Sequence, residues 1–171
     1  MIMLDSPDCA VRPARTADVR AIRRLVDHYA PSGQLLSKPT VSLYESVQEF
    51  RVAELDGQVV GCGAVHVMWE DLAEVRTVAV DPAYRGRGVG DLIVPALLDV
   101  ARELGVRRVF VLTFQVGFFR RHGFAEVSGA PVDEDVFAEL LRSYDEGVAE
   151  FLDLDRVKPN TLGNTRMLRH L

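Results

Sequence analysis

The chain has 171 residues, of which 48% are hydrophobic and 26% are charged, and its formal net charge is −5 at pH 7. These values are typical of one ordinary globular domain and exclude a wholly disordered chain or a collagen-like repeat. The acidic balance argues against nucleic acid as a partner, and no apolar run approaches the roughly 18 residues of a membrane span. The N-terminus lacks the features of a signal peptide, so we expect a cytoplasmic protein without a membrane partner.

The predicted elements favour an α/β fold with a mixed sheet between layers of helices. Residues 1–10 are expected to form a flexible tail before a single domain over 11–171, with its core in 11–128 and a C-terminal helix and strand in 129–171. In chain order we expect helices over 17–29 and 40–48, strands over 50–55, 58–67 and 73–80, a helix over 89–104, a strand over 108–113, a helix over 116–122 and a late helix from Val136 to Tyr144.

A glycine-rich stretch, Arg85-Gly86-Arg87-Gly88-Val89-Gly90, lies between a predicted strand and the longest predicted helix. Unpaired amides at the start of a helix and the helix dipole both favour a bound anion there. A P-loop would need Gly-Lys-Ser/Thr, but Gly90 is followed by Asp91-Leu92. A Rossmann loop would need a third glycine at Asp91 and an acidic residue about 20 positions later, and residues 105–119 contain none.

The stretch from Val78 to Gly90 resembles motif A of the GNAT superfamily of acyl-CoA-dependent N-acyltransferases, whose signature Gln/Arg-x-x-Gly-x-Gly/Ala is matched by Arg85, Gly88 and Gly90. The resemblance implies a three-layer fold with a central, mostly antiparallel mixed sheet. It also implies that the loop amides hold the pyrophosphate of acetyl-CoA, the co-substrate, and that no metal is needed. The coenzyme contacts that it implies are Val78, Ala79, Val80, Arg85, Gly86, Arg87, Gly88, Val89, Gly90 and Phe119.

Two charged residues, Glu74 and Arg76, lie on the strand before the loop, where apolar residues are expected. They either form an ion pair with each other or belong to a reaction centre. Several GNAT members carry a glutamate at this position as general base, so the resemblance implies that role for Glu74 and an oxyanion-binding role for the Val78 N–H. Many relatives have a tyrosine acid where this chain has Phe119. The thiolate then leaves without a proton donor, or Tyr144 serves instead.

The C-terminal stretch Lys158 to Leu168 and the segment Ser143 to Val148 are similar to short bacterial amino-acid N-acetyltransferases, the N-acetylglutamate synthases of arginine biosynthesis. This similarity implies acetyl transfer to the α-amine of L-glutamate. A dicarboxylic substrate needs fixed cations or amides. The candidates for this contact are Lys38, Arg76, Asn164 and Arg166.

Two rival functions stay open at this point. One is acetylation of another small amine, such as glutamine, an aminoglycoside or a polyamine, although a polycation would want an acidic pocket. The other is a non-catalytic sensor of acetyl-CoA or an amino acid, which Phe119 favours and Glu74 disfavours. A homodimer is compatible with the sequence but not indicated by it.

Overall fold

The computed structural model describes residues 9–155 and 163–171. The expected tail over 1–10 therefore lies outside the described residues up to position 8, and its last residue, Ala10, already begins a strand. The strands are β1 (Ala10–Pro13), β2 (Phe50–Leu55), β3 (Gln58–Trp69), β4 (Leu72–Val80), β5 (Arg108–Thr113), β6 (Ala125–Glu126) and β7 (Thr165–His170). The α-helices are α1 (Val19–Tyr29), α2 (Thr40–Glu45), α3 (Val89–Glu103), α4 (Val116–Arg121), α5 (Glu134–Leu140) and α6 (Glu146–Phe151).

The strands form one mixed sheet in the order β1-β2-β3-β4-β5-β7-β6. The register is antiparallel for β1 with β2, β2 with β3, β5 with β7 and β6 with β7, and parallel for β4 with β5. The predicted α/β fold with a mixed, mostly antiparallel sheet flanked by helices is therefore confirmed. By its contacts the chain divides into two compact units. We call residues 1–65 and 77–100 the loop unit, and residues 66–76 and 101–171 the acid-pair unit.

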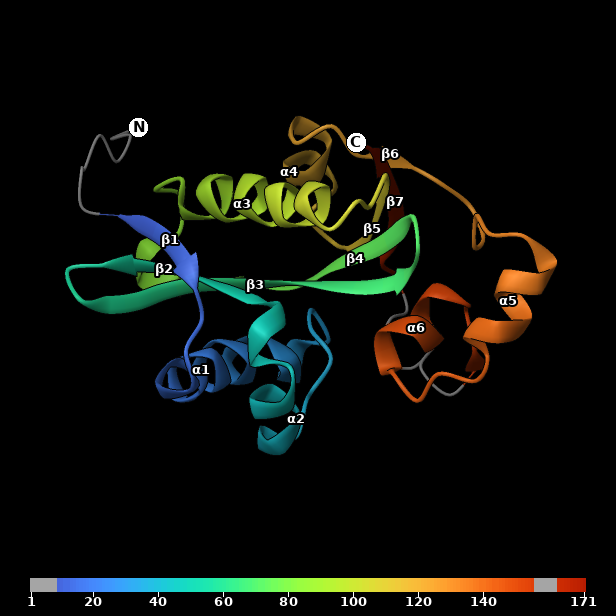
Figure 1. Ribbon diagram of the computed structural model, residues 1–171. Helices are drawn as coiled ribbons and strands as arrows, with labels where there is room; N and C mark the ends of the chain where they lie inside the picture. The colour runs from blue at the N-terminus through green and yellow to red at the C-terminus, as the bar shows by residue number, and fades with distance from the viewer. Residues whose placement is uncertain (1–8, 156–162) are drawn as a thin grey trace. The chain divides into compact units, whose positions relative to one another are not determined.

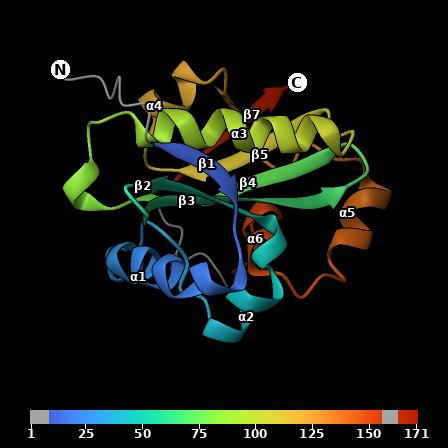
Figure 2. The same ribbon diagram turned by 60° about the vertical axis from the view of Figure 1, so that its left-hand side comes forward.

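In the loop unit, helices cover both faces of the strands: α1 and α2 lie on one face and α3 on the other (Figures 1 and 2). The apolar side of α1 packs with Leu43 of α2 and Phe50 of β2 into a core in which Leu43 is 0% and Phe50 2% exposed. On the other face, Gly61 and Gly63 of β3 leave room for α3 to approach the sheet closely. Both glycines lie in the strand, so they serve packing and not a turn.

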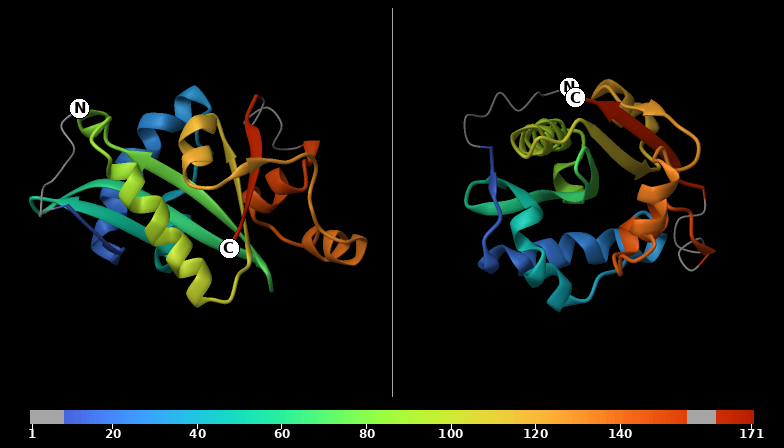
Figure 3. Two further views of the ribbon diagram at one scale, coloured as in Figure 1. Left: turned by 90° about the horizontal axis from the view of Figure 1, so that it is seen from above. Right: turned by 45° about the vertical axis from the view of Figure 1, so that its right-hand side comes forward.

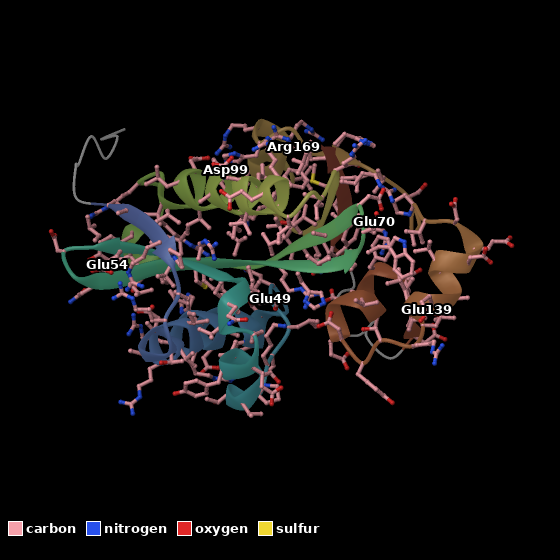
Figure 4. The ribbon with its side chains drawn as sticks, viewed as in Figure 1. Glu49, Glu54, Glu70, Asp99, Glu139 and Arg169 are labelled. Atoms are coloured by element: carbon pink, nitrogen blue, oxygen red, sulfur yellow. The ribbon has the colours of Figure 1, made fainter. Side chains whose placement is uncertain are left out.

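The start of α1 is fixed by an ion pair. Arg12 of β1 bonds Asp18 at 2.8 Å and Glu54 of β2, labelled in Figure 4, at 2.6 Å. The Asp18 carboxylate also accepts the backbone N–H of Arg15 at 2.7 Å. These hydrogen bonds, led by those from Arg12, lower the pKa of Asp18 although its burial opposes the charge.

In the acid-pair unit, β5 pairs along its whole length with β7 and, through its first three residues, with Leu72–Glu74 of β4. Phe110, Phe151 and Leu72 are fully buried in a core that also receives Leu140 of α5. The late helix expected from Val136 to Tyr144 is present as α5, but it ends already at Leu140, and a separate helix, α6, begins at Glu146; both lie in the orange part of the chain in Figure 3. The chain restarts because Asp145, with extended backbone angles, caps α6 by accepting the Val148 N–H at 2.9 Å.

None of the helices in the described parts of the chain has the length and apolar character of a membrane span. In the same residues, no group of three or more His, Cys, Asp or Glu side chains is arranged to hold a metal ion.

Candidate active site

The glycine loop has the backbone shape that its sequence predicts. Gly86 and Gly88 have φ angles of +73° and +83°, and a Cβ added to either would point into open space. Such angles favour glycine strongly. Helix α3 begins directly afterwards, at Val89. The start of the loop is anchored because the Asp81 N–H donates to the Val60 carbonyl of β3 at 2.8 Å.

The two arginines of the loop differ in their partners. Arg85 lies over the Tyr29 ring at 5.2 Å and donates its Nε–H to the Tyr29 hydroxyl at 3.2 Å. That hydroxyl in turn donates to the Val80 carbonyl at 2.5 Å, so α1, the end of β4 and the loop are tied together. Arg87 lies over the Tyr84 ring at 5.3 Å. Both arginines are exposed and keep positive charge beside the glycines.

The backbone of β4 is irregular at Thr77, whose φ is +56°. A β-branched residue in this region costs about 1–3 kcal/mol, and such strain is often found at functional sites. Thr77 is buried, and its carbonyl accepts the Cys62 Sγ–H at 3.4 Å. Because a left-handed residue interrupts the alternation of side chains along a strand, Glu74 and Arg76 need not share a face with Val78, as strict alternation would require.

Glu74 and Arg76 form the ion pair that the sequence left as one of two alternatives. The Arg76 Nε lies 3.2 Å from Glu74 Oε1, and the two side chains are only 9% and 7% exposed. The remaining Arg76 nitrogens bind both carboxylate oxygens of Asp145, at 2.8 and 2.7 Å. Within residues 9–155 and 163–171, the buried Glu74 Oε2 has no hydrogen-bond partner. A buried carboxylate oxygen without a donor is costly and therefore a candidate for catalysis.

Asp145 is held in its charged form. Burial opposes ionisation, but hydrogen bonds from Arg76, the charges of Arg76 and His66, and the Val148 N–H outweigh it and hold the pKa of Asp145 well below its usual range. His66 Nε2 lies 3.8 Å from Asp145 Oδ2. The acid-pair unit thus contains a cluster of two carboxylates and one guanidinium, in which Glu74 and Arg76 are buried and Asp145 is half-buried, with an imidazole beside it.

The other predicted site residues have different surroundings. The Lys38 carbonyl accepts a bond from Arg23 in the loop unit. In the acid-pair unit, Arg166 donates to the carbonyls of Gly129, Glu150 and Phe151, and burial lowers its pKa. The buried Asn164 Oδ1 has no hydrogen-bond partner among the residues that the structure describes.

Two aromatic residues were predicted in connection with the leaving thiolate. Phe119 is 4% exposed and packs edge-on against Phe124 at 5.3 Å. Beyond the end of α4, Arg169 of β7, labelled in Figure 4, donates to the His122 carbonyl. Tyr144 is 96% exposed, so its hydroxyl lies in solvent in this structure. The coenzyme contact of Phe119 and the acid role of Tyr144 both stay predictions.

Comparison with known proteins identifies the family of the chain. A sequence model of the acetyltransferase (GNAT) family matches residues 20–124 of this chain. An amino-acid acetyltransferase of Mycobacterium tuberculosis is 63% identical over 166 residues, which cover 94% of this chain and 95% of that protein. The chain belongs to the acetyltransferase (GNAT) family. The predicted family and the prediction that this chain is an enzyme are therefore confirmed.

Solved structures agree with this GNAT assignment. A Mycobacterium tuberculosis protein in complex with CoA and NLQ is 63% identical, with a TM-score of 0.92 over 95% of this chain and 99% of that one. The N-acetylglutamate synthase of Neisseria gonorrhoeae, complexed with coenzyme A and N-acetyl-glutamate, shares the fold at 24% identity, with a TM-score of 0.77. The match covers 95% of this chain but only 35% of the gonococcal chain.

The loop of this GNAT domain fits a pyrophosphate. Gly86 and Gly88 leave open space where side chains would stand, α3 begins at the next residue, and two exposed arginines flank the glycines. A doubly charged anion can therefore approach the backbone closely. These are features of residues 85–89 alone, and they support the use of acetyl-CoA that the family implies.

Sequence reasoning missed Asp145, His66 and Gly147. A Cβ on Gly147 would lie 2.6 Å from Arg76 Cζ, so the first turn of α6 lies directly against the guanidinium. The sequence does contain a signal for a helix start, since Asp145 is a favourable N-cap residue. It contains no signal that this cap pairs with an arginine 69 positions earlier.

Proposed function

We propose that this chain transfers the acetyl group of acetyl-CoA to the α-amine of L-glutamate, giving N-acetyl-L-glutamate and CoA, as a cytoplasmic enzyme of arginine biosynthesis. The observation that carries the proposal is the 63% identity, over nearly the whole of both chains, with an amino-acid acetyltransferase. The buried Oε2 of Glu74, which has no hydrogen-bond partner among the residues that the structure describes, supports it, because the reaction needs a proton acceptor.

Acetyl-CoA supplies an activated thioester. The amine attacks the carbonyl carbon only as the free base, and α-ammonium groups are mostly protonated at neutral pH. Glu74 accepts the proton at Oε2, directly or through one water, while Arg76 holds Oε1 at 3.2 Å. The attack forms a C–N bond, and the C–S bond then breaks to release the thiolate of CoA.

The Val78 N–H is the proposed donor to the oxyanion that develops on the carbonyl. The positive φ of the preceding residue, Thr77, supports this role, because it changes the direction of the next amide in the strand. The loop from Arg85 to Gly90 binds the pyrophosphate. The thiolate either leaves without a proton donor, because a thiol with a pKa near 8.5 is a tolerable leaving group, or receives a proton from Tyr144.

For the substrate carboxylates we propose the predicted residues Lys38, Arg76, Asn164 and Arg166. Arg76 already pairs with two carboxylates, so its substitution tests two roles together. Arg76→Ala should raise the KM for glutamate by about 10- to 150-fold relative to glutamine if it binds the side-chain carboxylate. An equal loss with both substrates would make it a partner of Glu74 only.

The decisive experiment follows CoA thiol release from acetyl-CoA with a panel of L-amino acids and identifies the product by mass spectrometry. We expect the highest kcat/KM with glutamate. Glu74→Gln should lower kcat by roughly 10²-fold or more, keep the KM for acetyl-CoA and regain part of its activity at high pH. A preference for another amine, or no thiol release with any amino acid, would contradict the proposed substrate. Wild-type turnover of Glu74→Gln at pH 7 would contradict the base.

A further inference from the structure

The start of helix α6 contacts the ion pair of β4 in a way that the reaction scheme above does not use. Asp145, the N-cap of α6, binds the Arg76 guanidinium with both carboxylate oxygens. A Cβ added to Gly147, two residues later, would lie 2.6 Å from Cζ of the same guanidinium and would push the guanidinium away. One short helix start therefore fixes the position of Arg76 by charge and by shape.

Asp145 and Glu74 receive unequal shares of the N–H donors of Arg76. A guanidinium forms its strongest contact when two parallel N–H groups meet one carboxylate. Here Asp145 takes that double contact, at 2.8 and 2.7 Å, and Glu74 receives a single bond from Nε at 3.2 Å. Glu74 consequently has one oxygen that is held and one that has no partner among the described residues.

Asp145 is itself held by its local backbone. Its Oδ2 accepts the Val148 N–H at 2.9 Å, and its own N–H donates to the Ser143 hydroxyl at 3.1 Å. Val148 is 3% exposed and belongs to the core of the acid-pair unit, so the helix start cannot shift without disturbing that core. The carboxylate is thus a fixed counter-ion and not a mobile surface group.

We infer that Asp145 is a positioning residue for Glu74, and that it acts by holding Arg76 so that Oε2 of Glu74 stays available for the proton of the amine. The inference rests on the proposed function, because it assumes that Glu74 is the base. If Asp145 were neutral, Arg76 would lose the carboxylate that takes its double contact. The guanidinium would then turn its paired N–H groups toward Glu74, occupy both oxygens and weaken the base.

Other charged groups near Glu74 define the background for a test by pH. Arg76 lies on the same strand, Asp145 at the start of α6, and His66 on β3 beside Asp145. Arg166 on β7 is close enough that the charge of Glu74 raises its pKa, although burial lowers that pKa more strongly. Loss of the Asp145 charge leaves Glu74 with more positive surroundings. The acidic limb of the kcat/KM profile should therefore move to lower pH while the plateau falls.

The first test is Asp145→Asn, which removes the charge but keeps the size and a side-chain acceptor for the helix cap. We expect kcat to fall about tenfold, inside the range for coupled neighbouring residues, with the KM for acetyl-CoA unchanged. Asp145→Glu should recover part of the loss. The matched control is Asp133→Asn, which removes the charge at the N-cap of α5 and should keep full turnover.

Gly147→Ala tests the same contact by shape without changing any charge, and we expect a comparable loss of kcat. Asp145→Asn should also shift the Nε–H NMR signal of Arg76, a readout that does not depend on catalysis. In a Glu74→Gln background, Asp145→Asn should change kcat by less than about twofold, because the residue through which it acts is already altered.

The outcomes separate the two proposals. Two results would overturn the positioning role and leave the proposed function intact. One is full turnover in folded Asp145→Asn, and the other is a loss of kcat on Asp145→Asn that is equal in the wild-type and Glu74→Gln backgrounds. Full turnover in Glu74→Gln alone would overturn the base and the positioning role together. An unchanged Arg76 signal in Asp145→Asn would show that the contact is not maintained by charge and would also overturn the inference, whichever amine is the substrate.

Discussion

Gly61 tests how closely α3 must approach the sheet for the loop unit to be stable. A Cβ at this position would lie 2.8 Å from Cδ1 of Ile93, 3.0 Å from Cγ1 of Val89 and 3.3 Å from the Ala79 carbonyl. Ile93 and Val89 are 0% and 1% exposed, so neither side chain can turn into solvent. Gly61→Ala must therefore shift the helix or force a side chain from its rotamer.

Overpacking by one methyl group costs about 1–3 kcal/mol. For a chain of this size, each kcal/mol lowers Tm by about 2–4 °C, so we expect Tm to fall by roughly 2–12 °C. The measurement is thermal unfolding followed by circular dichroism. Since Val89 begins α3 directly after the glycine loop, the KM for acetyl-CoA should rise as well.

The clash can be relieved at its closest point. Ile93→Val deletes the Cδ1 atom that lies 2.8 Å from the added Cβ, and alone it should cost about 0.5–1.5 kcal/mol. The double variant Gly61→Ala/Ile93→Val should lose less free energy of unfolding than the two single variants lose together. We expect this coupling energy to be at least about 0.5 kcal/mol. Gly117→Ala is the control, since its Cβ would meet nothing within 4 Å, and should be neutral. A wild-type Tm for Gly61→Ala, or full additivity, would refute the reasoning.

Three further predictions concern other parts of the chain. Gly88→Asp should abolish acetyl-CoA binding measured by calorimetry, while Gly57→Asp, also at positive φ and in open space, should bind normally; equal binding by both would refute the anion loop. Asp18→Asn should lower the free energy of unfolding at pH 7 by about 1.5–3 kcal/mol. Because folding lowers the pKa of Asp18, its contribution is present above the unfolded value and lost as pH falls through the folded value, so urea titrations should converge in acid. Burial raises the pKa of the Cys62 thiol to about 12, so a thiol reagent at pH 8 should modify Cys9 in the native protein and Cys62 only after unfolding.

The sequence determined the features whose cause is local. Apolar residues at helical spacing located α1 and α3, and Asp56-Gly57, between the two strands expected over 50–55 and 58–67, formed a tight turn with φ angles of 49° and 75°. The glycine loop before α3 was likewise predicted with its backbone freedom. In each case the residues that decide the conformation are neighbours in the chain, and steric limits on φ act at that range.

Local sequence patterns were insufficient to predict elements that depend on contacts with residues distant in the chain. β1 has four residues and no long alternation, and it exists because Ala10–Pro13 pairs with β2 about 40 positions later. The apolar pattern from Val136 to Tyr144 predicted the helix α5 but not its end at Leu140, nor the second helix that begins after the cap at Asp145. Secondary-structure propensity is a weak preference that a tertiary contact can override.

The candidate site also has features that the sequence indicated and features that only the tertiary structure decided. The type and spacing of Glu74 and Arg76 marked the strand as unusual, because two charges on a buried strand need a reason. Which oxygen is held and which has no partner among the described residues depends on Asp145, 69 residues from Arg76, and on a glycine at the start of α6 whose Cβ would push against the guanidinium. Only the folded chain brings Arg76 and Asp145 within 3 Å of each other, since an ion pair over that separation leaves no periodic trace in the sequence.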